Sequence, residues 1–226
     1  AIPAACGQTA GFTGKRRCGI ISAVMNKRVD LPEKKYEGYI FDLDGTLVDS
    51  MPLHYKAWRK ALARAGAPES VFREDEFYSC GGKSANDVVY FLNERYGLVL
   101  DAESTAADKR RIYLEMLEQE GMQPIGEVLE FVHSLGDAPK AIATGSAIPG
   151  ARRTLAAAGL TGLFDVILTP EDVEHGKPAP DMFLLAAERL GAAPSRCVVF
   201  EDAVPGIAAA AAAGMDCVRV RRTSLS

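Results

Sequence analysis

The chain has 226 residues, of which 25% are charged, and a formal net charge of −4 at pH 7. A chain of this length can bury one substantial core, either as a single α/β domain or as a main domain with an insert. The charge balance gives no basic field suited to nucleic acid, so we expect a small-molecule partner and no nucleic acid. No apolar run is long enough to span a bilayer, so we expect no membrane partner.

The first 28 residues carry five basic side chains and no Asp or Glu, and Gly, Ala and Thr are common among them. Such a segment is typical of a targeting peptide or of an upstream extension, and Met25 offers a plausible start. Because the segment lacks a clear amphipathic stripe, we favour the extension. We expect residues 1–35 to form a basic, mobile N-terminal extension, of which the first 28 residues add nothing to the core.

The five cysteines are scattered, odd in number and without the spacing of metal ligands. This pattern predicts reduced thiols and a cytoplasmic protein. We further expect the protein to be a monomer.

A short apolar stretch at residues 39–43 predicts a buried parallel strand, which Gly45 and Thr46 follow. Residues two apart on a strand project to the same side, so we expect Asp42 and Asp44 to converge where the strand ends. Two converging carboxylates repel each other unless a cation lies between them. A hard divalent ion such as Mg²⁺ suits them, because it binds carboxylate oxygens and keeps places for water and phosphate oxygens. The glycine comes too early for an EF-hand loop, so the pattern predicts a phosphate-handling site.

Residues 51–121 have helical patterning, whereas the later half of the chain alternates short apolar strands with helical stretches. A first helix is expected from Met51 to Ala65, where Gly66-Ala67-Pro68 ends it. The later strands are expected at residues 141–143, 166–168, 198–200 and 218–220. The predicted fold is therefore α/β, with a doubly wound parallel-sheet (Rossmann-like) core of residues 36–50 and 122–226 and a helical cap inserted at residues 51–121.

Polar groups follow the strand expected at residues 141–143. Thr144, Gly145 and Ser146 precede a helix start at which Pro149 can occupy the first turn. A hydroxyl and backbone N–H groups near a helix N-terminus favour an anion, so this turn is a candidate phosphate cradle. The alternative is that Ser146 only caps the helix.

Lys177 lies in a stretch that Pro178 and Pro180 stiffen. A rigid backbone around a lysine is useful if its ammonium must meet a phosphate at one place. The alternative is a solvated surface lysine.

Glu201 and Asp202 follow the strand expected at residues 198–200 and precede an alanine-rich helix. They either answer the dipole of that helix or complete a cation site with Asp42 and Asp44. Open α/β sheets bind ligands at the carboxyl ends of their strands, where all these groups are expected to gather.

Taken in order, these motifs resemble those of the haloacid-dehalogenase superfamily of phosphotransferases, from about Lys35 to the C-terminus. Closer similarity is to the branch that contains β-phosphoglucomutase and small sugar-phosphate phosphatases. The segments that carry the resemblance are Phe41 to Ser50, His54-x-x-Ala57-Trp58, Thr144-Gly145-Ser146, Lys177-Pro178-Ala179-Pro180-Asp181 and Glu201-Asp202-Ala203-x-x-Gly206-Ile207.

The resemblance implies that Asp42 is the nucleophile that forms an aspartyl-phosphate and that Asp44 is the general acid and then the base. To begin as an acid, Asp44 needs a raised pKa, which neighbouring carboxylates can supply unless the metal cancels their effect. Mg²⁺ would be held by Asp42, Asp202 and the backbone carbonyl of Asp44, with Glu201 as a further ligand or an outer partner.

The resemblance also implies how the phosphate is held. Lys177 would offset its charge, and Thr46 would steady the aspartate loop within the phosphate-binding region. Thr144 and Ser146, with the amides around Gly145, would bind the transferring phosphoryl oxygens, and we favour Thr144 for the direct contact.

Specificity is expected from the cap. His54 and Trp58 lie one helical turn apart and are expected to face the active site together, the alternative being a core histidine and a packing tryptophan. Lys109 resembles a substrate-contacting lysine of the branch, and Lys83 is a further candidate, although a solvated charge is the alternative for each.

The choice between phosphatase and mutase depends on the cap loop. β-Phosphoglucomutase has a cap arginine three positions after a loop glycine, and the third residue after Gly82 here is Ala85; Lys83 cannot make the same bidentate contact. We therefore favour hydrolysis of a small sugar phosphate, for example a hexose phosphate such as fructose 1-phosphate, over a mutase. A phosphate-accepting signalling module is less favoured, because it has no use for Asp44 as a general acid or for a cap that excludes water.

Overall fold

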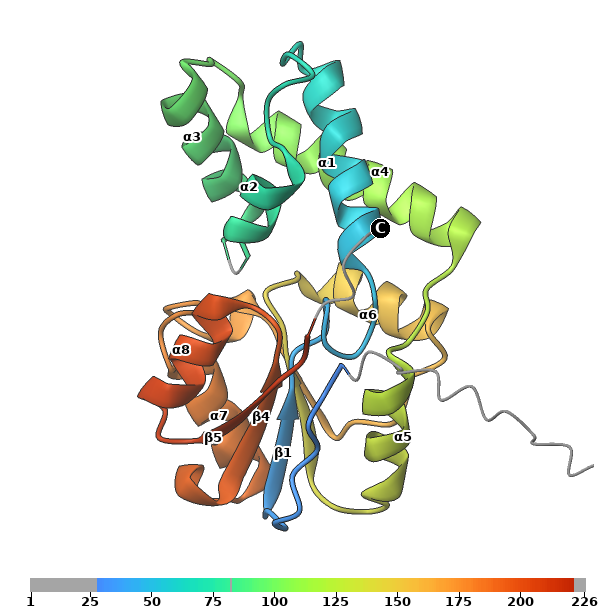
Figure 1. The fold of residues 1–226 in the computed structure, drawn as a ribbon, viewed down its shortest axis with the longest axis vertical. Helices are drawn as coiled ribbons and strands as arrows, with labels where there is room; N and C mark the ends of the chain where they lie inside the picture. Colours follow the sequence, from blue (N-terminus) through green and yellow to red (C-terminus); the bar gives the residue numbers. More distant parts are fainter. Residues whose placement is uncertain (1–27, 82, 222–226) are drawn as a thin grey trace, which may run out of the picture.

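The computed structural model describes residues 28–81 and 83–221. The elements are β1 (Gly38–Phe41), α1 (Met51–Arg64), α2 (Glu74–Ser79), α3 (Ala85–Tyr96), α4 (Ala102–Glu120), α5 (Gly126–Ser134), β2 (Lys140–Ala143), α6 (Ile148–Ala157), β3 (Val166–Leu168), η1 (Pro170–Asp172), α7 (Asp181–Leu190), η2 (Pro194–Arg196), β4 (Cys197–Glu201), α8 (Val204–Ala212) and β5 (Asp216–Arg219). Helices α1–α4 gather beyond the carboxyl ends of the strands, and the other helices flank the sheet (Figure 1).

The five strands form one parallel sheet in the order β3-β2-β1-β4-β5. The chain starts in the middle at β1, adds strands on one side, and then continues on the other side with β4. The order reverses between β1 and β4, which is where a doubly wound sheet opens a crevice for ligands. The predicted doubly wound core is confirmed.

Side chains of β1 alternate between the two faces of the sheet, as the pleat requires. Tyr39 and Phe41 pack in a buried cluster with side chains of α5 and α6, including Val128. Ile40 packs in another buried cluster with side chains of α7 and α8, including Phe183. Because helices cover both faces, every residue of β1 is buried.

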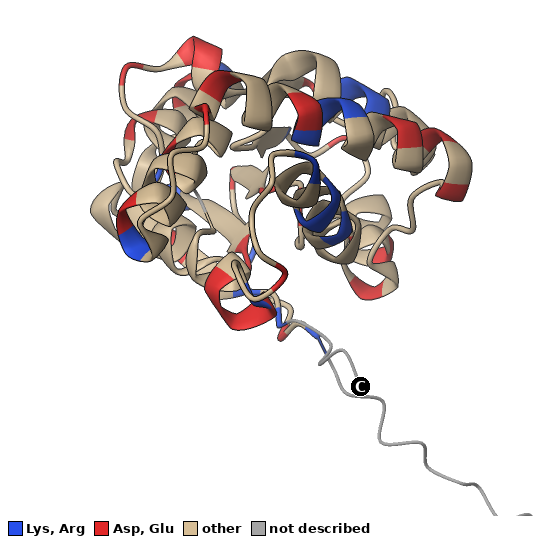
Figure 2. Cartoon of the chain, turned by 90° about the horizontal axis from the view of Figure 1, so that it is seen from above, with Lys and Arg blue, Asp and Glu red and all other residues tan. Residues whose placement is uncertain are grey.

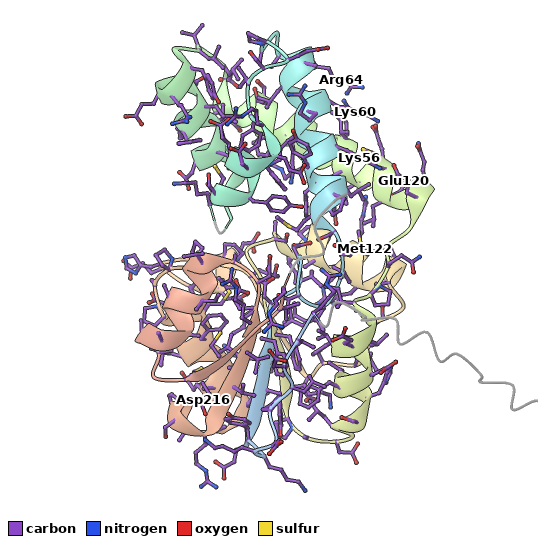
Figure 3. All side chains as sticks on the ribbon, in the orientation of Figure 1. Lys56, Lys60, Arg64, Glu120, Met122 and Asp216 are labelled. Atoms are coloured by element: carbon purple, nitrogen blue, oxygen red, sulfur yellow. The ribbon has the colours of Figure 1, made fainter. Side chains whose placement is uncertain are left out.

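Helix α1 is amphipathic, which explains how it leaves the core and supports the cap. Its buried residues are Leu53, Ala57, Trp58, Ala61 and Leu62, and its outer face carries Lys56, Lys60 and Arg64, which Figure 3 shows along one side of the helix. Lys56 pairs with Glu120 of α4 at 3.3 Å.

Basic and acidic residues are interspersed around the molecule (Figure 2).

Two linkers join the cap helices to the core, and they lie side by side. Val48 forms an antiparallel bridge with Pro124, and the Asp49 N–H donates to the carbonyl of Gln123 at 3.0 Å. Gly121 ends α4 with a φ of +72°, a conformation that side-chain-bearing residues rarely adopt. The chain therefore crosses between core and cap at one place.

One residue of the expected N-terminal extension belongs to the core. Val29 is fully buried in the cluster that also contains Phe41 and Val128. Its apolar side chain occurs within a basic stretch, so composition alone gave no sign of its burial. Residues 1–27, and with them most of the predicted extension, lie outside the described residues.

Cys80, Cys197 and Cys217 are free thiols, whereas Cys6 and Cys18 lie outside the described residues. Among the helices that the structure describes, none is long and apolar enough to cross a membrane.

The aromatic centre of the core can be tested by unfolding. Phe200 stacks on Phe41 with ring centroids 4.6 Å apart and lies 5.2 Å from Phe131. We expect Phe200→Ala to lower the free energy of unfolding by about 3–5 kcal/mol, measured by urea denaturation. Tyr90→Ala, at a position that is 60% exposed, should change it by less than about 0.5 kcal/mol. Equal losses in the two variants would contradict this account of the core.

Candidate active site

Three buried carboxylates meet at the switch point of the sheet. Asp42 follows β1, while Glu201 and Asp202 stand at the end of the neighbouring strand β4, and the Asp42 N–H donates to the carbonyl of Phe200 at 3.0 Å. Asp42, Glu201 and Asp202 each offer an oxygen within 4.8 Å of the others, and their exposed fractions are 7%, 1% and 4%. This all-oxygen donor set suits a hard divalent cation such as Mg²⁺.

Lys177 is the cation that the structure places in this cluster. Its Nζ donates to Asp42 Oδ1 at 2.7 Å, to the Ala143 carbonyl at 3.0 Å and to Glu201 Oε2 at 3.4 Å. Burial favours a neutral amine, but Asp42 and Glu201 raise the pKa of Lys177 well above its usual value, so the ammonium stays charged. The solvated-lysine alternative is wrong, because Lys177 is 9% exposed.

One lysine does not balance three carboxylates. Burial raises the pKa of Asp42, the Lys177 ammonium opposes the rise and Asp202 adds to it, so the pKa of Asp42 reaches about 7. Burial and the charge of Asp42 likewise raise the pKa of Glu201 well above its usual value. Full ionisation leaves two excess negative charges, and a divalent cation is the group that would neutralise them.

The aspartate loop is held against this cluster. Gly45 has a φ of +92°, and a Cβ there would lie 2.7 Å from Asp202 Oδ2. The hydroxyl of the buried Thr46 donates to Asp202 Oδ1 at 3.4 Å. Thr46 therefore steadies the loop through Asp202, and its hydroxyl is engaged with the acidic cluster.

The Asp44 carboxylate lies outside the acidic cluster, so the expectation that the side chains of Asp42 and Asp44 converge on one cation is wrong in this arrangement. The strand ends at Phe41, and the pleat that would align the two side chains does not extend to Asp44. Asp44 is instead held by three donors: Ser50 Oγ at 2.6 Å, Ser146 Oγ at 2.7 Å and His54 Nε2 at 3.2 Å.

These contacts decide the charge of Asp44. Burial would raise its pKa, but the His54 imidazole and the hydroxyls of Ser50 and Ser146 hold the pKa of Asp44 well below its usual range. The raised pKa expected of a general acid is therefore absent from this arrangement, which favours ionised Asp44. The reason is the set of hydrogen-bond donors, which stabilise the carboxylate.

A chain of hydrogen bonds links Asp44 to the cap. Lys109 Nζ lies 2.9 Å from His54 Nδ1, and since an ammonium only donates, Nδ1 must accept. His54 is then neutral and donates its Nε2–H to Asp44. Burial and the charge of Lys109 lower the pKa of His54, although Asp44 opposes this, and burial lowers the pKa of Lys109 to about 8.

The other predicted cap residues are placed differently. Trp58 is 4% exposed and packs edge-on against Phe72 inside the cap, with Lys109 Nζ 5.6 Å from its ring. It supports Lys109 from the cap interior, which agrees with the packing alternative. Lys83 is exposed in the loop between α2 and α3, and it takes no part in the contacts described above.

The turn after β2 uses its two hydroxyls for different purposes. Thr144 is buried, and its Oγ1 accepts the backbone N–H of Ser146 at 3.0 Å, which shapes the turn around the exposed Gly145. The hydroxyl that reaches Asp44 is that of Ser146. The alternative that Ser146 only caps the helix is wrong, because the N-cap of α6 is Ala147 and no side chain caps this helix.

Two further residues of this site were not predicted from the sequence. Ser50 is the N-cap of α1, but its hydroxyl makes no capping bond and donates to Asp44. Tyr113 stacks on His54 with ring centroids 4.0 Å apart, and its hydroxyl lies 2.9 Å from Thr154 Oγ1 of α6. Tyr113 comes four residues after Lys109 on α4, and this spacing was the signal that could have identified it.

Residues 36–214 match the haloacid dehalogenase-like hydrolase family. The chain belongs to this family. It is 39% identical over 189 residues to fructose-1-phosphate phosphatase YqaB of Escherichia coli, covering 83% of this chain and 98% of the relative. It is 36% identical over 187 residues to hexitol phosphatase A of the same organism, covering 81% and 82%. β-Phosphoglucomutase from Clostridium difficile has a similar structure, with a TM-score of 0.66, 26% identity and coverage of 80% of this chain and 83% of the other.

In this haloacid dehalogenase-like hydrolase the two aspartates that follow β1 occupy contrasting environments. Asp42 shares a buried cluster with two carboxylates and an ammonium, whereas Asp44 accepts hydrogen bonds from hydroxyl and imidazole groups. Such contrasting surroundings suit two carboxylates with different chemical roles, and here the two are only two residues apart.

The shape of the acidic cluster depends on a missing side chain in α8. A Cβ added to Gly206 would lie 1.9 Å from Glu201 Oε1. We expect Gly206→Ala to push the Glu201 carboxylate out of place, to lower stability by about 1–3 kcal/mol and to reduce the rise in Tm that Mg²⁺ causes.

The matched control is Gly150→Ala, because Gly150 is also the third residue of a helix and has open space around its Cβ position. It should keep both the stability and the Mg²⁺ response. An unchanged Mg²⁺ response in Gly206→Ala would show that the position of Glu201 is unimportant for the cation.

Proposed function

We propose that this protein is a Mg²⁺-dependent phosphatase that hydrolyses a small sugar phosphate, such as the hexose phosphate fructose 1-phosphate, through an aspartyl-phosphate on Asp42. The observation that carries the proposal is the pairing of Asp42 with Lys177 inside an oxygen-rich acidic cluster, next to a separately held Asp44. The relatives named as sugar and hexitol phosphatases support the substrate class.

Charge is the first obstacle to the reaction. A phosphate monoester is nearly a dianion at pH 7, so a carboxylate cannot approach phosphorus until that charge is offset. Mg²⁺ bound by Asp42, Glu201, Asp202 and the backbone carbonyl of Asp44 would supply positive charge. Lys177 adds a fixed ammonium 2.7 Å from the Asp42 carboxylate and holds it in place.

Asp44 handles the protons. The hydrogen bonds to Asp44 lower its pKa and keep the carboxylate ionised, so it can act as a base. The second half of the reaction requires such a base, when water attacks the aspartyl-phosphate. A phosphoryl group bound at residues 144–146 competes for the Ser146 hydroxyl, and the loss of that donor beside a new dianion raises the pKa of Asp44. Asp44 can then carry the proton that the leaving sugar oxygen needs.

The cap residues select the substrate in this proposal. Lys109 and His54 lie between the cap interior and Asp44, where a sugar hydroxyl can exchange hydrogen bonds with them. A mutase needs a second phosphate site on the cap. Ala85 begins α3 at the position where the mutase has arginine, and Lys83 is exposed, so these positions favour release of phosphate to water.

The proposal is tested by phosphate release from a panel of sugar phosphates, with and without Mg²⁺, beside a glucose 1-phosphate isomerisation assay. We expect Mg²⁺-dependent release, its abolition in Asp42→Asn, and a loss of about 10²- to 10⁴-fold in folded Asp44→Asn. A fully active Asp42→Asn enzyme would exclude the aspartyl-phosphate, and isomerisation exceeding release would assign the protein to the mutases.

The role of Lys109 gives a pH dependence. Because its pKa is lowered to about 8, its positive charge is present below pH 8 and is lost as the pH rises through that value. We expect kcat/KM for a sugar phosphate to decline above about pH 8, and Lys109→Met to have a lower kcat/KM without this decline. With p-nitrophenyl phosphate, which has no sugar for the cap to bind, the two enzymes should have similar profiles. A decline that persists in Lys109→Met would assign it to another group.

A further inference from the structure

Residues 28–30, which we call the N-terminal strap, lie before the residues that match the family and yet are built into the fold. Val29 is fully buried. The backbone N–H groups of Arg28 and Val29 donate to the two carboxylate oxygens of Glu127 at 3.2 and 3.3 Å. Glu127 lies in the first turn of α5, just after the linker that returns from the cap. The strap therefore binds the start of the helix that follows the returning linker.

The strap also binds Arg221, which lies two residues after the end of β5. The Arg221 N–H donates to the Arg28 carbonyl at 2.6 Å, and Arg28 Nε donates to the Arg221 carbonyl at 3.0 Å. The Arg221 guanidinium in turn pairs with Asp30. These contacts fix the backbone of the strap and the direction of the Arg28 side chain.

The Arg28 guanidinium reaches the other linker. Its Nη1 lies 3.2 Å from Asp49 Oδ2, and the Arg28 side chain is only 13% exposed. Asp49 donates its N–H to Gln123 of the neighbouring linker, and the next residue, Ser50, donates its hydroxyl to Asp44. Arg28 thus holds the linker one residue before a group that binds Asp44.

The cap meets the core again away from the linkers. A Cβ built on Gly81, in the loop after α2, would lie 3.3 Å from the Cβ of Ala203 at the start of α8. A substrate that enters between these surfaces requires them to separate, and the cap can then move only about residues 48–50 and 121–125. The strap contacts the first of these segments through Asp49 and, through Glu127, the helix that begins directly after the second.

We propose that Arg28 is a positioning residue, which clamps the outgoing linker through Asp49 while the strap backbone, through Glu127, fixes the start of the helix that follows the incoming linker. The clamp keeps the cap and Ser50 in register with Asp44. Its effect on turnover rests on the function proposed above, but the clamp itself does not.

The test is hydrogen exchange, measured by mass spectrometry on the full chain, in peptides that contain residues 46–50 and 121–125. Arg28→Gln removes the guanidinium but keeps the buried Val29 and the backbone bonds to Glu127. We expect exchange in both linker peptides to rise about fivefold, because a partly buried ion pair is lost, while the sheet strands are unchanged. Asp49→Asn should give a similar rise, and the double variant no more than the larger single effect.

Lys34→Gln is the matched control. Lys34 also makes an ion pair near the start of the described chain, at 3.1 Å from Asp216, but both side chains are more than half exposed and Figure 3 places Asp216 at the end of the core far from the cap. It should leave exchange in both linkers unchanged. Linker exchange that is unaffected by Arg28→Gln, or a rise spread equally over the sheet, would overturn the clamp.

Kinetics provide the functional readout. We expect Arg28→Gln to lower kcat/KM about threefold to fivefold for the best sugar phosphate, mainly through a higher KM. We expect a smaller loss for p-nitrophenyl phosphate, which has no sugar for the cap to bind and depends on the clamp only through Ser50 and Asp44. Equal losses on both substrates would overturn the positioning role. If wild-type protein released no phosphate from any substrate, the proposed function would fail while the exchange experiment still decided the clamp.

Discussion

The contact between Lys177 and Asp42 is the interaction on which the site depends. Three buried carboxylates at the edge of a parallel sheet repel one another, and the ammonium that offsets part of their charge lies 2.7 Å from Asp42. Because one lysine is not enough, the cluster retains excess negative charge and raised carboxyl pKa values. In the proposed function, this excess charge would favour a divalent cation at the acidic cluster, and the cation together with Lys177 would let Asp42 approach a phosphate dianion.

The second constraint is the separation of Asp44 from that cluster. Ser50, Ser146 and His54 bind its carboxylate, and they come from the linker, the turn after β2 and the first cap helix. The position and charge of the Asp44 carboxylate are thereby tied to the position of the cap, since His54 is held by Lys109 and stacked on Tyr113. The N-terminal strap extends this arrangement to the linkers, so elements far apart in the sequence act on one carboxylate.

Much of the fold and the site could be predicted from the chain. Local patterns predicted the first strand, which ends at Phe41 and not at residue 43, and the alternation of strands and helices after residue 121. Local patterns also identified the motifs that contain Asp42, Lys177 and Asp202. Contacts between distant segments were less predictable. A serine ahead of a helix indicates a cap, so the bond from Ser50 to Asp44 could not be inferred, and the burial of Val29 in a basic stretch had no local signal.

By itself the sequence determined the order of strands and helices and the residue types that reach the carboxyl ends of the strands, because apolar periodicity and glycine or proline positions act over short distances. Only the tertiary structure decided which carboxylates share a cluster, which hydroxyl meets Asp44, that Trp58 faces the cap interior, and that Arg28 reaches Asp49. Those outcomes depend on the packing of segments separated by many residues, and the charge state of each group follows from the neighbours that packing supplies.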